Sequence, residues 1–253
     1  MTTNPHRTGR PAAVSHTAEP RPRLDYYLIL SPISARPPEP RAEGILVEEF
    51  VRDCDWSTLG LRSAGWTPAD GGWWSFASFS RGMRTDPKLS GRVTPVGRGA
   101  AEASYRQLGG GRLPAEAVLR TYFRHYEPFP TAPPLRLGPA DAPDGFHEQR
   151  VYRVLFAKDL RADQLANLSA GWRTPAEDDP ADQARGMPAG RLRVGSDLFD
   201  WNLRRIGQGL AWCLDLTASL ATDADDAVGP VLHELTAVLR RQGLIPVTTE
   251  RFA

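Results

Sequence analysis

Six prolines lie within residues 127–145, between two longer segments that each have the composition of a folded domain: Pro128, Pro130, Pro133, Pro134, Pro139 and Pro143. Proline has no backbone N–H donor and disfavours helix at the residue before it, so regular structure cannot continue far through such a segment. We therefore predict an N-terminal lobe at 24–126, a proline-rich linker at 127–145 and a C-terminal lobe at 146–253. Residues 1–23 are predicted to be a disordered tail.

The C-terminal lobe ends with two clear patterns. Apolar residues alternate with polar ones over 199–216, on both sides of Gly207, which predicts a β-hairpin. Apolar residues then fall on one helical face over 228–239, and Gly243 follows as a helix end.

Weaker patterns complete that lobe. Residues 151–157 and 191–194 have strand composition, and a short helix near 160–168 is expected to end at Gly171. The resulting order is β-α-β-β-β-α, with a further strand possible at 244–248. One layer of helices on one antiparallel sheet is the simplest packing for this order.

The N-terminal lobe gives a similar order in weaker patterns. The predicted elements are a strand at 24–30, a helix near 45–53, a turn around Trp66, an aromatic strand at 73–79, and helices near 97–108 and 114–125. The fold class is therefore α+β, with two small lobes that each pack helices on a mainly antiparallel sheet. Residues 64–69 (AGWTPA) resemble residues 170–176 (AGWRTPA), which raises the hypothesis of a diverged internal duplication with a helix stop at Gly65 and Gly171.

Composition sets outer limits. The 253 residues are 41% hydrophobic and 24% charged, with a net charge of +1. The first residues contain no apolar run of signal-peptide length, and the early segment 26–30 is too short to cross a bilayer, so we expect a cytoplasmic protein without a membrane anchor. Two cysteines make neither a disulfide framework nor a zinc site.

Aromatic and basic residues are concentrated in the first lobe. Four tryptophans lie within nineteen residues, followed by a stretch at 81–112 with seven basic and two acidic side chains. Such a surface could bind a protein partner or an anionic ligand; the alternative is that the rings fill the lobe's core and the arginines are solvated. The candidate binding residues are Trp56, Trp66, Trp73, Trp74, Arg81, Arg84 and Arg92. Near-neutral net charge and the absence of a recognition-helix spacing disfavour nucleic acid.

The sequence contains no catalytic motif. No phosphate loop, dinucleotide fingerprint or nucleophile elbow is present, and no histidine or cysteine has metal-ligand spacing, so we predict no catalytic residue, metal or cofactor. The first hypothesis is a non-catalytic binding or regulatory protein. The alternative is a small-molecule enzyme with an anionic substrate between the lobes and His125, His147 or Asp215 as proton carriers. Ligand, partner and oligomeric state cannot be predicted from the sequence.

Overall fold

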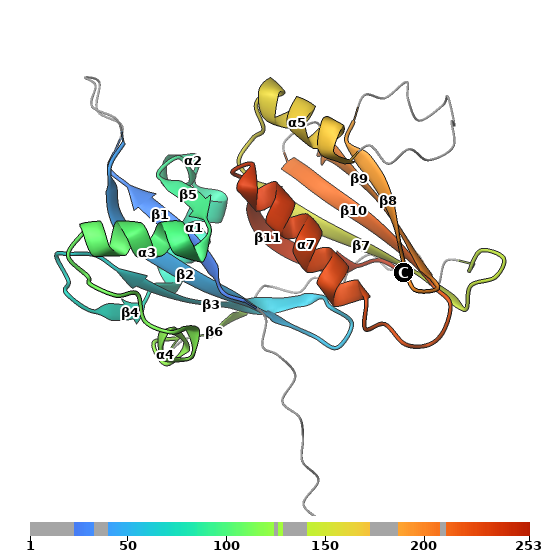
Figure 1. Cartoon of the computed structure of the whole chain (residues 1–253), viewed down its shortest axis with the longest axis horizontal. Coiled ribbons are helices and arrows are strands. Elements are labelled where there is room, and N and C mark those ends of the chain that lie inside the picture. The colour runs from blue at the N-terminus through green and yellow to red at the C-terminus, as the bar shows by residue number, and fades with distance from the viewer. Residues whose placement is uncertain (1–22, 33–39, 124–125, 129–140, 173–186, 208–210) are drawn as a thin grey trace, which may run out of the picture.

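A computed structural model describes residues 23–32, 40–123, 126–128, 141–172, 187–207 and 211–253. The chain forms two lobes, each built on an antiparallel β-sheet with helices packed against it (Figure 1). This confirms the predicted α+β class. All but the last residue of the predicted tail, most of the predicted linker and His125 lie outside the described residues.

The first lobe contains the strands β1 (Asp25–Leu30), β2 (Ala42–Arg52), β3 (Thr58–Trp66), β4 (Trp73–Ser75), β5 (Val93–Val96) and β6 (Tyr126–Pro128). Their order in the sheet is β4-β3-β2-β1-β5, and β6 pairs with β3. The central strands are joined as hairpins, so neighbours in the sequence are neighbours in the sheet. Because β6 belongs to this sheet, the first two residues of the predicted linker are part of the first lobe.

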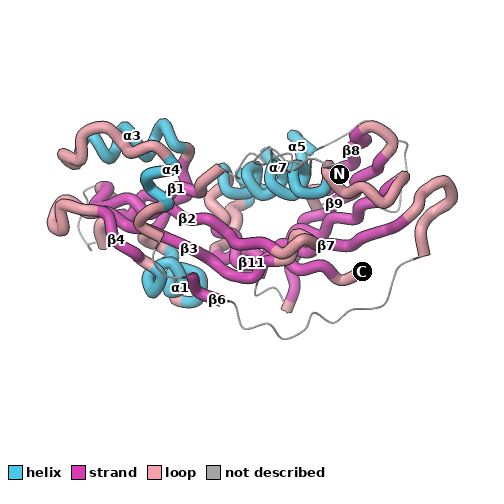
Figure 2. The backbone as a smooth tube through the Cα atoms, turned by 90° about the horizontal axis from the view of Figure 1, so that it is seen from below, coloured by secondary structure: helices cyan, strands magenta, loops and turns pink. Residues whose placement is uncertain are grey.

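The helices of this lobe are α1 (Ala77–Thr85), α2 (Pro87–Ser90), α3 (Arg98–Gln107) and α4 (Glu116–Arg120). They cover both faces of the sheet, with α1 and α3 on opposite sides (Figure 2). Ile45 and Val47 pack in the cluster that contains Tyr105 of α3, whereas Leu46 packs with Met83 of α1. The central strand β2 is therefore buried on both faces.

This double burial overturns the helix predicted near residues 45–53. A strand covered on both faces is apolar at successive positions and loses the alternation that identifies a half-exposed strand. Here the apolar residues at 45–47 are followed by Glu48 and Glu49, and this pattern of apolar and polar positions also fits an amphipathic helix. The helix predicted at 97–108 is confirmed by α3, while the one predicted at 114–125 is reduced to α4 within the described residues.

The second lobe contains β7 (Glu148–Ala157), α5 (Ala162–Trp172), β8 (Ala189–Val194), β9 (Asp197–Ile206), β10 (Ala211–Leu220), α7 (Val228–Arg241) and β11 (Ile245–Arg251). The sheet order is β11-β7-β10-β9-β8, and all pairs are antiparallel. Helices α5 and α7 lie on the same side of this sheet (Figure 2). The predicted hairpin, terminal helix, last strand and single helical layer are confirmed.

The paired Ala-Gly-Trp segments do not occupy equivalent structures. Trp66 ends strand β3, whereas Trp172 ends helix α5. Gly65 pairs with β2 and β4, and Gly171 lies inside α5 without a positive φ, so neither glycine stops a helix. Both tryptophans are nevertheless buried, as expected. The duplication itself stays a hypothesis.

The lobes meet along strand β11. Two of its backbone N–H groups donate to first-lobe hydroxyls: Thr249 N to Thr58 Oγ1 at 3.0 Å and Arg251 N to Ser57 Oγ at 3.3 Å. Ile245 of β11 also packs in the same cluster as Leu46 of β2. The turn before β3 thus covers one edge of the second sheet. Among the described residues, no helix is long and apolar enough to cross a membrane.

Candidate functional site

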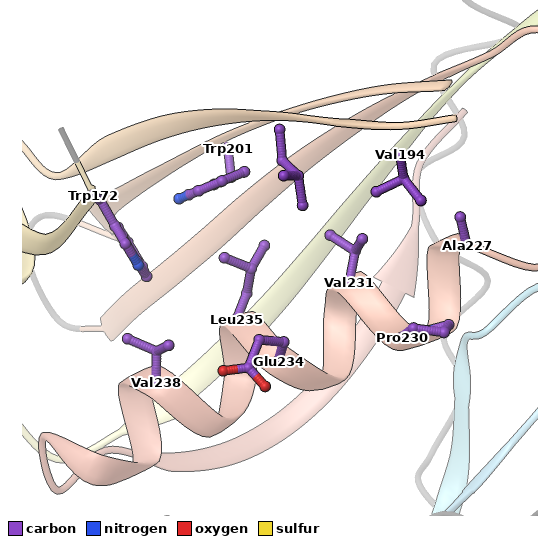
Figure 3. A pocket seen from close by; sticks show the side chains of 10 residues that line it. Trp172, Val194, Trp201, Ala227, Pro230, Val231, Glu234, Leu235 and Val238 are labelled. Carbon is purple, nitrogen blue, oxygen red and sulfur yellow. The ribbon is translucent and has the colours of Figure 1, made fainter. Parts of the chain in front are cut away.

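An apolar groove of about 450 Å³ lies on the helical side of the second sheet (Figure 3). Its walls come from the end of α5, from β8 and β9, and from one face of α7. The lining residues are Trp172, Leu192, Val194, Trp201, Ala227, Pro230, Val231, Glu234, Leu235 and Val238. All but Glu234 are apolar.

The groove lies where the two helices leave the last strand of the sheet only partly covered. Phe199 and Leu203 of β9 are fully buried, but Leu192 and Val194 of the neighbouring strand β8 are 44% and 38% exposed. Only three large apolar side chains are this exposed in the described part of the chain, and two of them stand on β8. Clustered exposed apolar side chains mark binding surfaces more often than single ones do.

Two tryptophans form the floor and one end of the groove. The rings of Trp172 and Trp201 meet edge to face, with centroids 6.0 Å apart. Trp201 lies across Gly190, where an added Cβ would come within 2.5 Å of the ring. The absence of a side chain at Gly190 therefore leaves room for the indole. The Trp201 Nε1–H is shielded from solvent and has no acceptor among the described residues. A carbonyl oxygen would satisfy this donor once the side chains that shield it moved aside.

Charge lies only at the groove's rim, as far as the described residues go. Glu234 is 69% exposed and pairs with Arg241 at 3.4 Å. No histidine, cysteine or second carboxylate lines the groove within the described ranges. Such a lining can hold apolar groups, but its described residues give no arrangement for proton transfer or nucleophilic attack.

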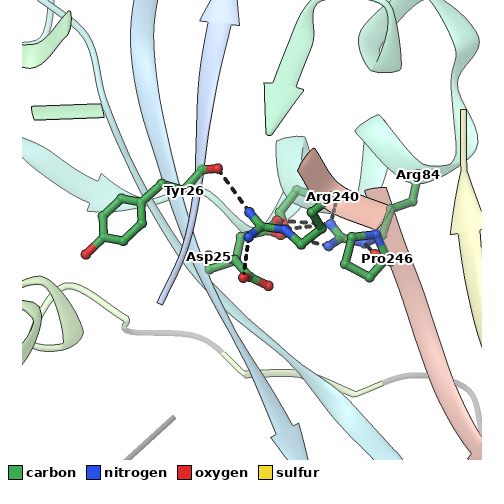
Figure 4. A network of polar contacts seen from close by, with 7 residues as sticks. Asp25, Tyr26, Arg84, Arg240 and Pro246 are labelled. Atoms are coloured by element: carbon green, nitrogen blue, oxygen red, sulfur yellow. Dashed lines mark hydrogen bonds and ion pairs between the residues drawn. The ribbon is translucent and has the colours of Figure 1, made fainter. Parts of the chain in front are cut away.

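A second notable cluster is the charged network between the lobes (Figure 4). Arg84 of α1 pairs with Glu48 of β2 at 2.7 Å, and both side chains are almost completely buried. Arg84 Nε also donates to the Pro246 carbonyl of β11 at 2.8 Å. Every charge here has a partner of opposite sign, so the cluster fixes the lobes to one another.

Arg240 and Asp25 extend this network from α7 to β1. Arg240 Nη1 lies 2.7 Å from Asp25 Oδ1, and Nη2 donates to the Tyr26 carbonyl at 3.1 Å. Burial raises the pKa of Asp25 above its ordinary value, although the nearby Arg240 acts in the opposite direction. The raised pKa is thus explained by burial between the lobes, where Asp25 already has Arg240 as its partner.

The structure does not gather the predicted aromatic residues into one surface. Trp66 is 4% exposed and packs with Tyr105, which also contacts Trp73. Trp74 contacts Phe76 instead. The side chain of Trp56 packs against the core of the second lobe. Their binding role stays a prediction, and the core alternative describes Trp66 best.

The predicted arginines also lie apart and have different surroundings. Arg84 is buried in the network between the lobes, and Arg92 is held by the Leu30 carbonyl at 2.9 Å and by Glu43 at 3.1 Å. Arg81 is exposed on α1. No shared anion site follows from these three positions.

The proton carriers of the enzyme alternative do not converge in the described part of the chain. Asp215 lies on the sheet face away from the helices, paired with Arg153 and Arg204 at 2.6 Å each. His147 is exposed before β7, and His233 is exposed on α7. Among the described residues, no group of three or more histidine, cysteine or acidic side chains could hold a metal.

Sequence reasoning missed the groove. Trp172 and Trp201 each look like ordinary core residues, and α7 was recognised only as an amphipathic helix. The available signal was the pair of apolar residues Leu192 and Val194 beside arginines in a short strand, which is unusual for an exposed edge. Comparison with protein-family models, curated proteins and solved structures found no match to this chain.

Proposed function

We propose that this chain is a non-catalytic binding protein that holds an apolar segment of a protein partner in the groove of its second lobe. The observation that carries the proposal is the groove's lining: apolar side chains from four elements, α5, β8, β9 and α7, surround an open volume, and the indole N–H of Trp201 has no acceptor among the described residues. A peptide supplies both apolar side chains and carbonyl acceptors, which an aliphatic molecule does not. A cytoplasmic setting is part of the same proposal.

The location differs from the first-lobe surface predicted from the sequence. Trp66 packs in the first core, Trp56 packs against the second core and Arg84 is buried between the lobes, whereas Leu192 and Val194 are exposed and adjoin an open volume. Apolar area that is solvated in the free protein gains about 25 cal/mol for each Å² covered on binding. The groove therefore offers more binding free energy than the separated first-lobe residues.

The experiment measures binding of the apolar fluorophore anilinonaphthalene sulfonate. We expect one saturable site in the wild-type chain, with energy transfer from tryptophan, and an affinity about fivefold to tenfold lower in the double variant Leu192→Ser, Val194→Ser. Both side chains are exposed, so the fold should tolerate the change. Val118→Ser is the matched control, since Val118 is 45% exposed on α4 of the first lobe. Equal binding by all three proteins would reject the groove as the site.

A further inference from the structure

Strand β8 is the open edge of the second sheet. It pairs with β9 on one side, and no strand pairs with its other side within the described residues. The opposite edge, β11, has Thr249 and Arg251 amides bound by first-lobe hydroxyls. Exposed edges present unpaired N–H and C=O groups that can pair with another chain. One edge of the sheet is thus covered, and the other has no partner strand in the part of the chain that the structure describes.

The phase of the β8–β9 ladder shows which backbone groups face outward. Leu203 N–H donates to the Pro188 carbonyl at 2.8 Å, one residue before the strand begins. In antiparallel pairs, hydrogen-bonded positions alternate with positions whose N–H and C=O point away from the partner. Counting from Pro188, the outward-pointing groups belong to Ala189, Arg191 and Arg193.

The two faces of β8 differ in chemistry. Leu192 and Val194 line the groove, so Arg191 and Arg193 lie on the opposite face. The Arg193 guanidinium donates to the Ser196 carbonyl at 3.3 Å and has no carboxylate partner among the described residues, whereas Arg191 pairs with Asp200 of β9. A strand added beside β8 would place alternate side chains next to the groove and the others next to these arginines.

We infer that β8 binds an extended segment of the partner by strand addition, and that this segment alternates apolar residues with acidic ones. The inference rests on the proposed function and names the conformation and chemistry of its ligand. Backbone hydrogen bonds to the outward-facing edge of β8 would hold the segment, apolar side chains would fill the groove, and an acidic side chain would pair with Arg193.

Charge disfavours a second copy of this chain as the occupant. A two-fold axis perpendicular to the sheet pairs two β8 strands antiparallel and leaves each side chain on its original face. The arginine face of one strand therefore continues into the arginine face of the other. Whether the axis passes through position 191, 192 or 193, an arginine lies opposite an arginine. Like charges directly opposite one another on a sheet are destabilising. An acidic partner strand removes this conflict.

The test uses the whole chain and an acetylated, amidated heptapeptide in which glutamate alternates with valine; a peptide with lysine in place of glutamate is the control. We expect saturable binding of the glutamate peptide and slower amide hydrogen exchange, by about tenfold, at Arg191 and Arg193. Arg193→Pro removes an outward N–H without removing a β9 hydrogen bond, and should weaken binding by about tenfold relative to Arg193→Ala, about 1.4 kcal/mol. Arg193→Ala carries the same loss of charge and is the matched control.

The outcomes distinguish strand addition from the groove proposal. Fluorophore binding in the groove without peptide binding, or peptide binding equal in the proline and alanine variants, would overturn strand addition and leave the groove proposal standing. Equal affinity for the lysine peptide would overturn the acidic preference. Self-association of the wild-type chain that Arg193→Pro abolishes would identify a second copy as the occupant, against our inference. Failure of both fluorophore and peptide to bind would reject both proposals.

Discussion

The guanidinium of Arg240 on α7 lies 2.7 Å from the carboxylate of Asp25 on β1, and this contact joins the two lobes. Arg240 also lies over the ring of Tyr27, 4.9 Å from its centroid. One side chain from the second lobe therefore meets a carboxylate, a backbone carbonyl and an aromatic ring of the first. Together with the Arg84–Glu48 pair, it sets the position of the first lobe against β11 and α7.

We expect Arg240→Met to destabilise the chain by about 3–5 kcal/mol, because the substitution leaves the buried Asp25 carboxylate without its partner. The neighbouring Arg241→Met is the control: Arg241 is 62% exposed and pairs with exposed Glu234, a contact of about 0–1 kcal/mol. Urea unfolding of both variants measures the difference. Similar losses in the two variants would show that Arg240 makes no special contribution.

Asp25 should also make stability depend on pH. Its pKa is raised in the folded chain, chiefly by burial, so the folded state holds this proton at pH values where the unfolded state has released it. The stabilisation is complete below the ordinary aspartate pKa and is lost as pH rises through the folded value.

The Asp25→Asn variant lacks this titration. Relative to wild type, we expect the variant to become more stable as pH increases above about 4, the region of the ordinary aspartate pKa. Urea unfolding of both proteins at a series of pH values gives the comparison. A difference in the opposite direction would mean that Arg240 outweighs burial and lowers the pKa instead.

Local patterns were sufficient for the second lobe. The alternation in β9 and β10 and the helical face of α7 correspond to elements with one covered and one exposed side, which is the case that periodicity detects. Periodicity gave the wrong element for the central strand β2, because β2 is buried on both faces and does not alternate. Glu48 added to the error, since its partner Arg84 is distant in sequence and the pair cannot be recognised before the fold is known.

The groove could not be predicted for a related reason. It is a space between α5, α7 and β8, and its size depends on how far the helices reach across the sheet. Two of the predicted binding residues pack internally: Trp66 in the first core and Trp56 against the core of the second lobe. Sequence density of tryptophan indicates large contact area, but it does not say which contacts are internal.

Gly229 in the first turn of α7 accommodates the Trp56 ring. An added Cβ at Gly229 would lie 2.3 Å from that ring. Glycine to alanine within a helix ordinarily stabilises by about 0.5–1 kcal/mol, but here the overlap must move Trp56, whose backbone has a φ of 67°. We expect Gly229→Ala to destabilise the chain by about 1–3 kcal/mol, the usual cost of overpacking. Thermal unfolding checks the sign, and a rise in melting temperature would contradict the contact.

Gly190 likewise leaves room for an aromatic ring, here that of Trp201 in the groove. Its substitution distinguishes an effect on ligand binding from an effect on stability. A Cβ at Gly190 would lie 2.5 Å from Trp201, so Gly190→Ala must push the indole toward the open volume beside Trp172. Because Trp201 is only partly buried and can move toward solvent, we expect a loss of stability of about 1 kcal/mol or less but a reduction of fluorophore affinity by about tenfold. Gly195→Ala, in the β8–β9 turn at φ +58°, is the control: it strains the same hairpin without any atom near the added Cβ. If the control reduced affinity as much as Gly190→Ala, the effect would come from the hairpin backbone and not from the position of Trp201.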